Sequence, residues 1–389
     1  MSQFANPFLH YEGCNYLRQR CVLSLLSGRP IKITGIRSLE ESPGLNDYEV
    51  CFLKLLDEIT NGTKVDINRS GTTLTFVPGM LHGGTFSFAC HLARALSYYL
   101  EPLMMLAPFC KQPIRATLCG VTNNLTDVSI DCLKSAWLPV MSKFLLNDEN
   151  LELKLLKRGF LPDGGGSVTF SCPVCRQLKP VKVEKAGKVR RIRGTAFAAK
   201  VSPTLLNRMI TAARQQFHGY LSDIHVTHDH RKGEAGGRSP GYGLHLRAET
   251  TAGVVYTADG MSQPRGAHTP SVPEELGEEV ARRLVAEIYR GGSVDSSCQS
   301  LTALFMALGQ PDVSRYFTGS LSNYTVHMLR HLRDFFNCTF KIDTLGPGGL
   351  QTGNGEENDD EDQLKLGAPN KALLTCVGVG YSNLNKVLL

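Results

Sequence analysis

Segments patterned like strands alternate with segments patterned like helices, and this alternation limits the possible folds more than any other feature of the chain. Residues 29–36 alternate as a strand does, while residues 47–60 place apolar side chains at helical spacing. Strand-like segments follow at 64–68 and 72–77. A second round comprises expected helices at 86–107 and 129–144 and expected strands at 114–119 and 152–158. The recurring order of strand, helix, strand and strand predicts a repeated α/β unit.

The composition changes near residue 179, where basic residues accumulate and a new strand, helix, strand, strand pattern begins. We therefore expect an α/β (α+β) fold in which a large domain of three repeated two-layer α/β units is interrupted by a smaller inserted α/β domain. The expected boundaries are 1–185 for the first two units, 186–276 for the inserted domain, 277–345 for the third unit, 346–370 for an acidic disordered loop, and 371–389 for a C-terminal strand that closes the large domain.

Length, hydropathy and charge restrict the class of protein. The chain has 389 residues, 42% of them hydrophobic, which suffices for about two or three folded units with real cores. The longest apolar stretch is interrupted by Glu101, Pro102 and Pro108, so no membrane-spanning segment is expected. The start of the chain lacks a secretory pattern, which leaves a cytosolic or nuclear location. Without the six acids of residues 355–362, the net charge of +6 becomes about +12, which fits either contact with nucleic acid or basic residues spread over the whole surface.

Two small clusters have the spacing of metal ligands. Cys172 and Cys175 form the chain's only CxxC, and a structural zinc site usually needs a second pair, so we expect ordinary thiols. His225, His228 and His230, with Asp229 among them, could also ligate a metal. A single exposed turn of this kind more often reflects a polar loop, so we expect no metal.

The segment RGFLPDGGGSV at residues 158–168 closely resembles the signature of the RNA 3'-terminal phosphate cyclase family. Similar motifs occur in the family's order at Glu12-Gly13, Pro43-Gly44-Leu45, residues 71–78 and Gly378-Val379-Gly380. The signature residues that match are Arg158, Gly159, Pro162, Gly164, Gly165 and Gly166.

The resemblance implies an enzyme in which a histidine attacks ATP to form an enzyme–AMP intermediate, but this chain has Tyr324 at the aligned position. His327 and His331 are nearby and out of register. A protonated tyrosine is a poor substitute nucleophile. The family's glycine-rich turn is replaced by residues 14–16, its cationic stretch by residues 46–49, and its Asp-Gln pair by Ser300-Leu301. We therefore expect a pseudoenzyme without a cofactor; residual cyclase activity would require an ATP pocket that survives these changes.

Residues 321–332 resemble the non-cyclase, ribosome-biogenesis branch of the family. That resemblance implies a protein of the nucleus and nucleolus with no membrane contact. It implies a component of the small-subunit processome that partners a ribosome-assembly GTPase and other processome proteins. The expected RNA partners are pre-rRNA and small nucleolar RNA, and the expected role is support of early pre-rRNA cleavages during 40S subunit maturation.

Two sets of charged residues are candidate sites within that role. The basic run could hold RNA phosphates or, equally, an acidic peptide of the GTPase. It consists of Lys182, Lys185, Lys188, Arg190, Arg191 and Arg193. Arg330, Arg333 and Asp334 suggest an alternative function as a pre-rRNA endonuclease, through charge stabilisation and general-base action. Adjacent arginine and aspartate on a helix are more often a solvated face, so we favour the non-catalytic function.

Overall fold

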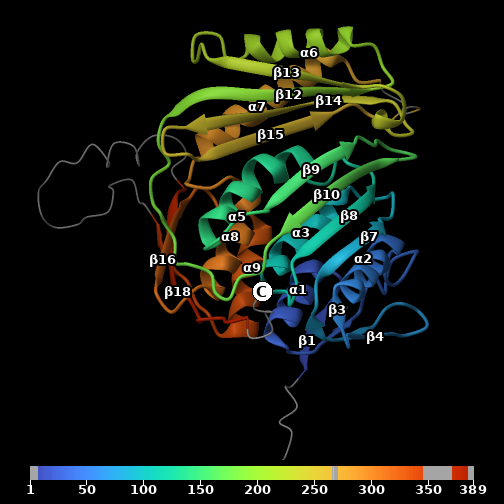
Figure 1. The fold of residues 1–389 in the computed structure, drawn as a ribbon, viewed down its shortest axis with the longest axis vertical. Coiled ribbons are helices and arrows are strands. Elements are labelled where there is room, and N and C mark those ends of the chain that lie inside the picture. The colour runs from blue at the N-terminus through green and yellow to red at the C-terminus, as the bar shows by residue number, and fades with distance from the viewer. Residues whose placement is uncertain (1–7, 265, 267–269, 345–369, 384–389) are drawn as a thin grey trace, which may run out of the picture.

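The computed structural model describes residues 8–264, 266, 270–344 and 370–383. The expected acidic loop at 346–370 therefore lies outside the described residues, apart from Asn370. The described chain forms four four-stranded sheets and one two-stranded sheet. Figure 1 shows one sheet with its two helices stacked above the remainder of the molecule.

The first unit pairs the strands in the order β1-β2-β5-β4, with β1 and β2 parallel and the other pairs antiparallel. Its sheet alternates buried and exposed residues, as β2 illustrates with Ile31 and Ile33 facing the core. The elements are β1 (Leu9–Glu12), α1 (Leu17–Ser27), β2 (Ile31–Thr34), α2 (Asp47–Glu58), β4 (Lys64–Ile67) and β5 (Leu74–Val77), with the small pair β3 (Thr60–Asn61) and β6 (Met80–Leu81) beside them.

The second unit repeats this topology in the order β7-β8-β10-β9. Its elements are β7 (Gly84–Ala89), α3 (Leu96–Leu106), β8 (Ile114–Gly120), α4 (Ile130–Cys132), a π-helical turn η2 (Leu133–Trp137), α5 (Leu138–Phe144), β9 (Glu152–Lys157) and β10 (Gly166–Cys172). The expected helix at 86–107 is wrong in its first part, because Phe86 and Phe88 alternate with exposed residues in β7, and the helix begins only at Leu96.

The third unit has the same topology again, in the order β11-β16-β18-β17. Its elements are β11 (Lys182–Val183), α8 (Gln299–Leu308), β16 (Val313–Thr318), α9 (Asn323–Phe336), β17 (Lys341–Thr344) and β18 (Ala372–Val377). A strand, β18, lies where the closing strand was expected, and it pairs with β16 and β17. Because β11 precedes the inserted domain, the insertion interrupts the third unit between its first and second strands, so this unit already begins before residue 186.

The inserted domain differs in strand order, β13-β12-β14-β15, and carries both of its long helices on one face. Its elements are β12 (Val189–Ala199), α6 (Thr204–Gln215), β13 (Ile224–Arg231), β14 (Gly241–Thr250), β15 (Val255–Met261) and α7 (Pro273–Arg290). The boundary expected at residue 276 falls inside α7. That helix buries Leu276, Val280 and Leu284 in the core of the inserted sheet, so packing assigns it to this domain.

The three repeated units share a single hydrophobic core, and the inserted domain has a separate one. A small apolar cluster of Phe160, Phe197, Ala199 and Met261 lies between them. Across the described residues, no helix has the length and apolar character needed to cross a membrane.

Candidate functional site

Tyr324 lies at the start of α9, where α1 and α3 also meet. The hydroxyl of Ser322 caps this helix by accepting the backbone N–H of Thr325 at 3.2 Å. Gln19 of α1 donates its amide to the Tyr324 carbonyl at 2.9 Å. Tyr324, the residue expected to align with the family's nucleophile, is thus anchored to the first unit through its backbone.

A cation and a carboxylate lie beside the Tyr324 ring. Arg18 is centred 5.9 Å from that ring, donates to Glu101 at 2.6 Å, and covers the Tyr98 ring at 4.3 Å. Burial, and then the Glu101 carboxylate, raise the pKa of Tyr324 well above its ordinary value. The phenol is therefore neutral near physiological pH and is a weak nucleophile, while the Arg18 guanidinium is held by Glu101.

The turn that replaces the expected glycine-rich motif adds an aromatic side chain to this region. Tyr16 has a positive φ of 59° and stacks on His327, with ring centroids 4.1 Å apart. His331 is buried, and its Nδ1 is hydrogen-bonded to the side-chain amide oxygen of Gln19 at 3.0 Å. Burial, with a smaller effect of Arg20, lowers the pKa of His331 to about 3, so this imidazole is neutral. Both histidines near Tyr324 are engaged in packing.

The other departures from the cyclase pattern are also parts of the protein's internal structure. Asn46 and Glu49 form a capping box at the start of α2, and Glu49 binds Arg37 at 2.7 Å. Ser300 and Leu301 are buried in α8.

Arg330, Arg333 and Asp334 lie on α9 but do not converge into a compact acid–base site. The two arginines are exposed, and the Arg333 Nε is 4.0 Å from the Asp334 carboxylate. That carboxylate accepts the Tyr11 hydroxyl at 3.4 Å, and the Asp334 carbonyl accepts from Arg29. Asp334 is therefore already committed to contacts with the first unit.

Arg158, the head of the family signature, is 1% exposed and connects the two domains. Its guanidinium donates to Asp131 of the large domain at 2.9 Å and to Asp229 of β13 at 2.8 Å. It also lies 4.1 Å from the centre of the Phe197 ring on β12. Burial favours a neutral Asp131, but the Arg158 guanidinium outweighs it and holds the pKa of Asp131 well below its usual range.

The signature glycines allow backbones to approach each other at the same junction. A Cβ on Gly159 would lie 2.2 Å from the Gly166 nitrogen, and Gly164 adopts a φ of 62°. Gly165 lies against Arg238 of the inserted domain, and the Arg238 N–H donates to the Gly164 carbonyl at 2.9 Å. The peptide bond before Pro162 is cis. The close packing of backbones at this domain junction explains why glycine occupies these positions.

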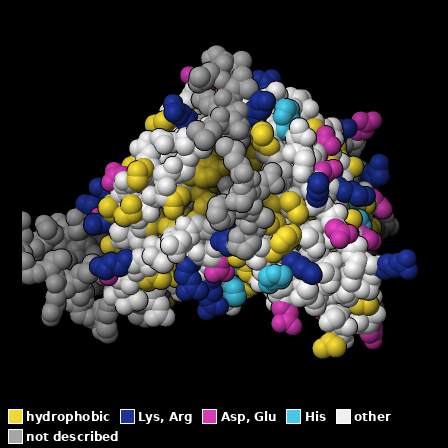
Figure 2. Space-filling view, turned by 90° about the horizontal axis from the view of Figure 1, so that it is seen from below, with side chains coloured by type: hydrophobic (Ala, Val, Ile, Leu, Met, Phe, Trp, Pro, Cys, Tyr) yellow, Lys and Arg dark blue, Asp and Glu magenta, His cyan; other side chains and the backbone are white. Residues whose placement is uncertain are grey.

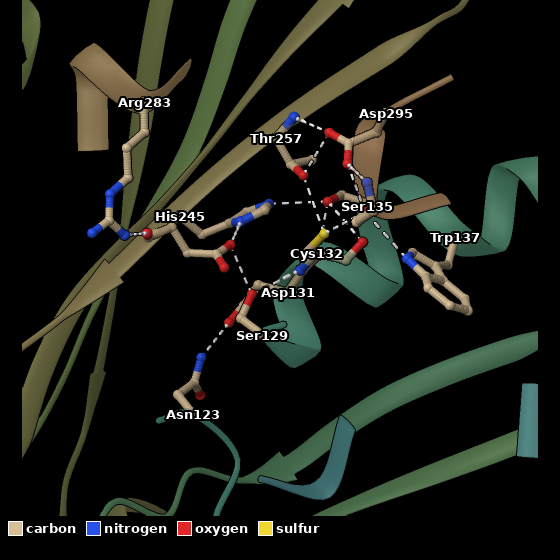
Figure 3. A network of polar contacts seen from close by, with 12 residues as sticks. Asn123, Ser129, Asp131, Cys132, Ser135, Trp137, His245, Thr257, Arg283 and Asp295 are labelled. Atoms are coloured by element: carbon tan, nitrogen blue, oxygen red, sulfur yellow. Dashed lines mark hydrogen bonds and ion pairs between the residues drawn. The ribbon is translucent and has the colours of Figure 1, made fainter. Parts of the chain in front are cut away.

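A second polar network joins α4 and η2 to the inserted sheet, as Figure 3 shows. His245, which is 4% exposed, lies between Ser135 at 3.0 Å and Asp259 at 2.8 Å. Ser129 donates to the same Asp259 oxygen at 2.8 Å. Sequence reasoning missed this network because its members are isolated polar residues far apart in the chain.

The basic run spans two sheets and is partly neutralised. Lys182 lies in β11 of the third unit, and Lys185 and Lys188 lie in the chain segment that connects β11 to β12. Arg191 binds Glu249 at 2.6 Å, with Arg190 at 3.9 Å from the same carboxylate, and Arg193 binds Asp223 at 2.8 Å.

Figure 2 shows that at the end opposite the inserted domain, basic side chains are interspersed with acidic ones around exposed hydrophobic groups.

The two clusters with metal-like spacing take ordinary structural roles. The histidine segment is a strand, β13, where a polar loop was expected; His228 contacts Asn207, and His230 contacts the Val201 carbonyl. Cys172 and Cys175 are buried, and burial raises the pKa of the Cys172 thiol well above its ordinary value. Over the described ranges, no group of three or more His, Cys, Asp or Glu residues could hold a metal ion.

The model of the RNA 3'-terminal phosphate cyclase family matches residues 9–342. The chain therefore belongs to this family, which confirms the resemblance drawn from its motifs. A Caenorhabditis elegans protein named a probable RNA 3'-terminal phosphate cyclase-like protein is 49% identical over 382 residues, covering 98% of this chain and 99% of that protein.

Two further relatives match over nearly their whole length. The human RNA 3'-terminal phosphate cyclase-like protein is 48% identical over 380 residues, with 98% of each chain covered. The Schizosaccharomyces pombe rRNA processing protein rcl1 is 35% identical over 379 residues, with 97% of each chain covered. The chain is thus similar to two proteins that are named cyclase-like and to one that is named for rRNA processing.

Proposed function

We propose that this chain is a non-catalytic, cyclase-like component of rRNA processing that acts in the small-subunit processome. It supports the early pre-rRNA cleavages that lead to the 40S subunit, in the nucleolus, and it binds a ribosome-assembly GTPase together with pre-rRNA or small nucleolar RNA. The name of the Schizosaccharomyces pombe relative supports the rRNA-processing part of this proposal.

The observation that carries the non-catalytic part is the environment of Tyr324. The phenol of Tyr324 has a strongly raised pKa, and its neighbour Arg18 is bound by Glu101 at 2.6 Å. An enzyme of the cyclase type needs a nucleophile and a cation free to meet the phosphates of ATP, and here both groups are otherwise engaged.

The test is depletion of the protein in cells, followed by expression of a tagged copy. We expect depletion to accumulate uncleaved pre-rRNA and the tagged copy to be recovered with early small-subunit precursors, nucleolar RNA and a GTPase. Normal pre-rRNA cleavage after depletion, or a tagged copy absent from these precursors, would contradict the proposal.

A further inference from the structure

The inserted sheet ends on one side at β13, an edge strand that pairs with β12 alone among the described strands. With eight residues, β13 is longer than any other strand at an edge of the described sheets. It contains no proline and no lysine, two residues that commonly protect an edge from pairing with another chain. Such an edge is a template for an additional strand.

The first half of β13 leaves backbone hydrogen-bonding groups unpaired. The Ile192 N–H of β12 donates to the carbonyl of Asp223, just before β13, at 2.9 Å. Because successive residues of a strand direct their backbone groups to opposite edges, the N–H and C=O groups of Val226 and His228 point away from β12. No described residue forms a hydrogen bond with these outward groups. The edge therefore offers donors and acceptors at the spacing of a β-ladder.

The side chains of this segment point alternately to the two faces of the sheet. Val226 lies in the core that is formed with α6 and α7, and His228 contacts Asn207 of α6 at 2.9 Å. His225 and Thr227 therefore project from the opposite face, and both are exposed.

Each face has a hollow beside the start of β13. On the face of His225 and Thr227 there is a pocket of about 130 Å³, whose lining includes these two residues with Arg193 and Arg247. On the helix-covered face, a hollow of about 560 Å³ lies between Ile224 and the end of α6. A strand added beside β13 would direct successive side chains alternately to the pocket and to the hollow.

The pocket has a small excess of positive charge. Three carboxylates outside its lining bind residues within it, in the pairs Asp223–Arg193, Asp259–His245 and Glu249–Arg247. Four arginines accompany them, because Glu249 also lies 3.9 Å from Arg190 and binds Arg191 at 2.6 Å. The two Nη groups of Arg247 and the exposed ring of His225 make no hydrogen bond to a described residue. These donors and the single excess charge suit one acidic side chain.

The hollow on the helix-covered face is wider and partly apolar. Leu221 and Ile224 line it together with the ring of Tyr220, which is 86% exposed. Arg214 and His218 also belong to its lining. An aromatic side chain suits this set, because it packs against the apolar groups and its face attracts the Arg214 cation.

We propose that β13 accepts an extended segment of a partner protein as a fifth strand of the four-stranded inserted sheet. An acidic side chain of that segment binds Arg247 and His225 in the pocket, and the apolar or aromatic side chain next to it enters the hollow beside Tyr220. This inference rests on the proposed function, in which the chain binds other proteins.

The edge favours a polypeptide over the alternatives. An RNA backbone carries a phosphate at every nucleotide, which the single excess charge of the pocket does not balance, and its phosphates would face the outward carbonyls of Val226 and His228. A second copy of this chain would present its own β13, whose one acid, Asp229, is already bound by Arg158 at 2.8 Å.

The test begins with photo-crosslinking in cells. The full-length tagged protein carries p-benzoylphenylalanine either at Thr227, on the pocket side, or at His228, on the α6 side. We expect both positions to crosslink to neighbouring residues of one segment in one protein that is recovered with small-subunit precursors. That segment should contain Asp or Glu next to an apolar residue. The same group at Tyr289 of α7, which is 58% exposed, is the control and should not crosslink to the segment.

A synthetic peptide of the crosslinked segment then measures binding to the full-length protein by fluorescence anisotropy. His228→Pro should weaken binding about tenfold or more, because proline removes the outward N–H, whereas His228→Thr should bind like the wild type. Both variants lose the contact with Asn207, so that loss does not distinguish them. Methylation of the peptide nitrogens that face β13 should also abolish binding, which tests the ladder even if His228→Pro does not fold.

The pocket is tested by changes on both sides of the contact. Arg247→Gln should weaken binding of the unchanged peptide about tenfold. When Gln replaces the acidic residue of the peptide, Arg247→Gln should cause little further loss, as expected if the two groups bind each other.

Crosslinks from Thr227 and His228 to RNA, to a second copy of this chain or to unrelated proteins would overturn the inference. Equal binding by His228→Thr and a folded His228→Pro would do the same, and thermal unfolding shows which variants are folded. A protein that is recovered with small-subunit precursors but forms no such crosslink would overturn this inference alone. Binding of the segment without recovery in precursors would instead contradict the proposed function.

Discussion

The Arg158 guanidinium and the Asp131 carboxylate form a bidentate ion pair, with both N–O distances at 2.9 Å. Arg158 comes from the segment between β9 and β10, and its Nε donates to Asp229 of the inserted domain. A single buried cation thus ties the two domains together, and removing one of its partners leaves charge uncompensated in a site shielded from water.

Asp131→Asn is therefore expected to lower the free energy of unfolding by about 3 kcal/mol, measured by urea denaturation near neutral pH. The stability that this carboxylate contributes is complete above about pH 4, the ordinary pKa of an aspartate. It is lost as the pH falls through the lower pKa that Asp131 has in the folded protein. Glu152→Gln is the matched control, because Glu152 pairs with Lys154 at the surface and should change stability by less than about 1 kcal/mol. Similar losses of stability in the two variants would contradict a special role for the ion pair between Arg158 and Asp131.

The family signature shows what the sequence could and could not predict. Its glycines could be matched to the family from the sequence alone, but the partners of Arg158 are 27 and 71 residues away in the chain, and no local pattern links them. The same limit hid His245 and Asp259. Pairing across a domain interface depends on how two folded surfaces meet, which periodicity does not record.

The fold could be predicted more completely from the sequence than the site, and the errors in that prediction have local causes. Phe86 and Phe88 were merged with the apolar helix that follows, although their alternation fits a strand. The expected boundary placed most of α7 in the third unit, because an amphipathic pattern does not indicate which sheet a helix packs against. In the structure, Val280 and Leu284 of α7 pack against the inserted sheet.

Acid should destabilise the protein partly through His331. Its folded pKa is depressed to about 3, below the unfolded value, so its neutral form stabilises the fold above about pH 6.5. Between about pH 7 and about pH 5 this group alone should cost about 2 kcal/mol, because the unfolded chain gains a proton that the folded chain does not. His331→Gln should flatten the pH dependence of unfolding, whereas His218→Gln at an exposed site should leave the wild-type slope. An unaltered slope in His331→Gln would show that the buried imidazole is not responsible.

Incubation with ATP labelled at the α-phosphate should give no covalent adduct on the protein, since the raised pKa of the Tyr324 phenol keeps it neutral and therefore weakly nucleophilic. Tyr324→His should also remain unlabelled. Restoring the imidazole does not release Arg18 from Glu101 or move the Tyr16 ring from His327. Denaturing gel electrophoresis with autoradiography reads the result, and an active cyclase of the family is the positive control. An acid-labile label on either form would contradict the pseudoenzyme assignment.

Charge reversal in the basic run should impair incorporation into small-subunit precursors. Replacing Arg190, Arg191 and Arg193 with glutamate puts like charges beside Glu249 and Asp223, and the segment would then repel an anionic partner. Recovery of tagged protein with precursors measures the effect, and Arg282→Glu on α7 is the control. If the folded triple variant is incorporated into precursors as well as the wild type is, the basic run is not part of the binding surface.

Asp334→Asn separates the non-catalytic function from an endonuclease. The asparagine carbonyl can still accept the Tyr11 hydroxyl, now 3.4 Å from the carboxylate, so the variant should fold and enter precursors normally. If the protein acts without cleaving RNA, early pre-rRNA cleavage should proceed at the wild-type level, because the Asp334 carboxylate is held by Tyr11, and the two histidines of α9 are engaged elsewhere, His327 with the Tyr16 ring and His331 with Gln19. If Asp334 is a general base, cleavage should fall by a factor of about 100 or more while incorporation persists. Northern analysis of pre-rRNA, alongside recovery of the tagged variant, distinguishes the two outcomes; a loss of cleavage reproduced by purified protein on an RNA substrate would establish the nuclease.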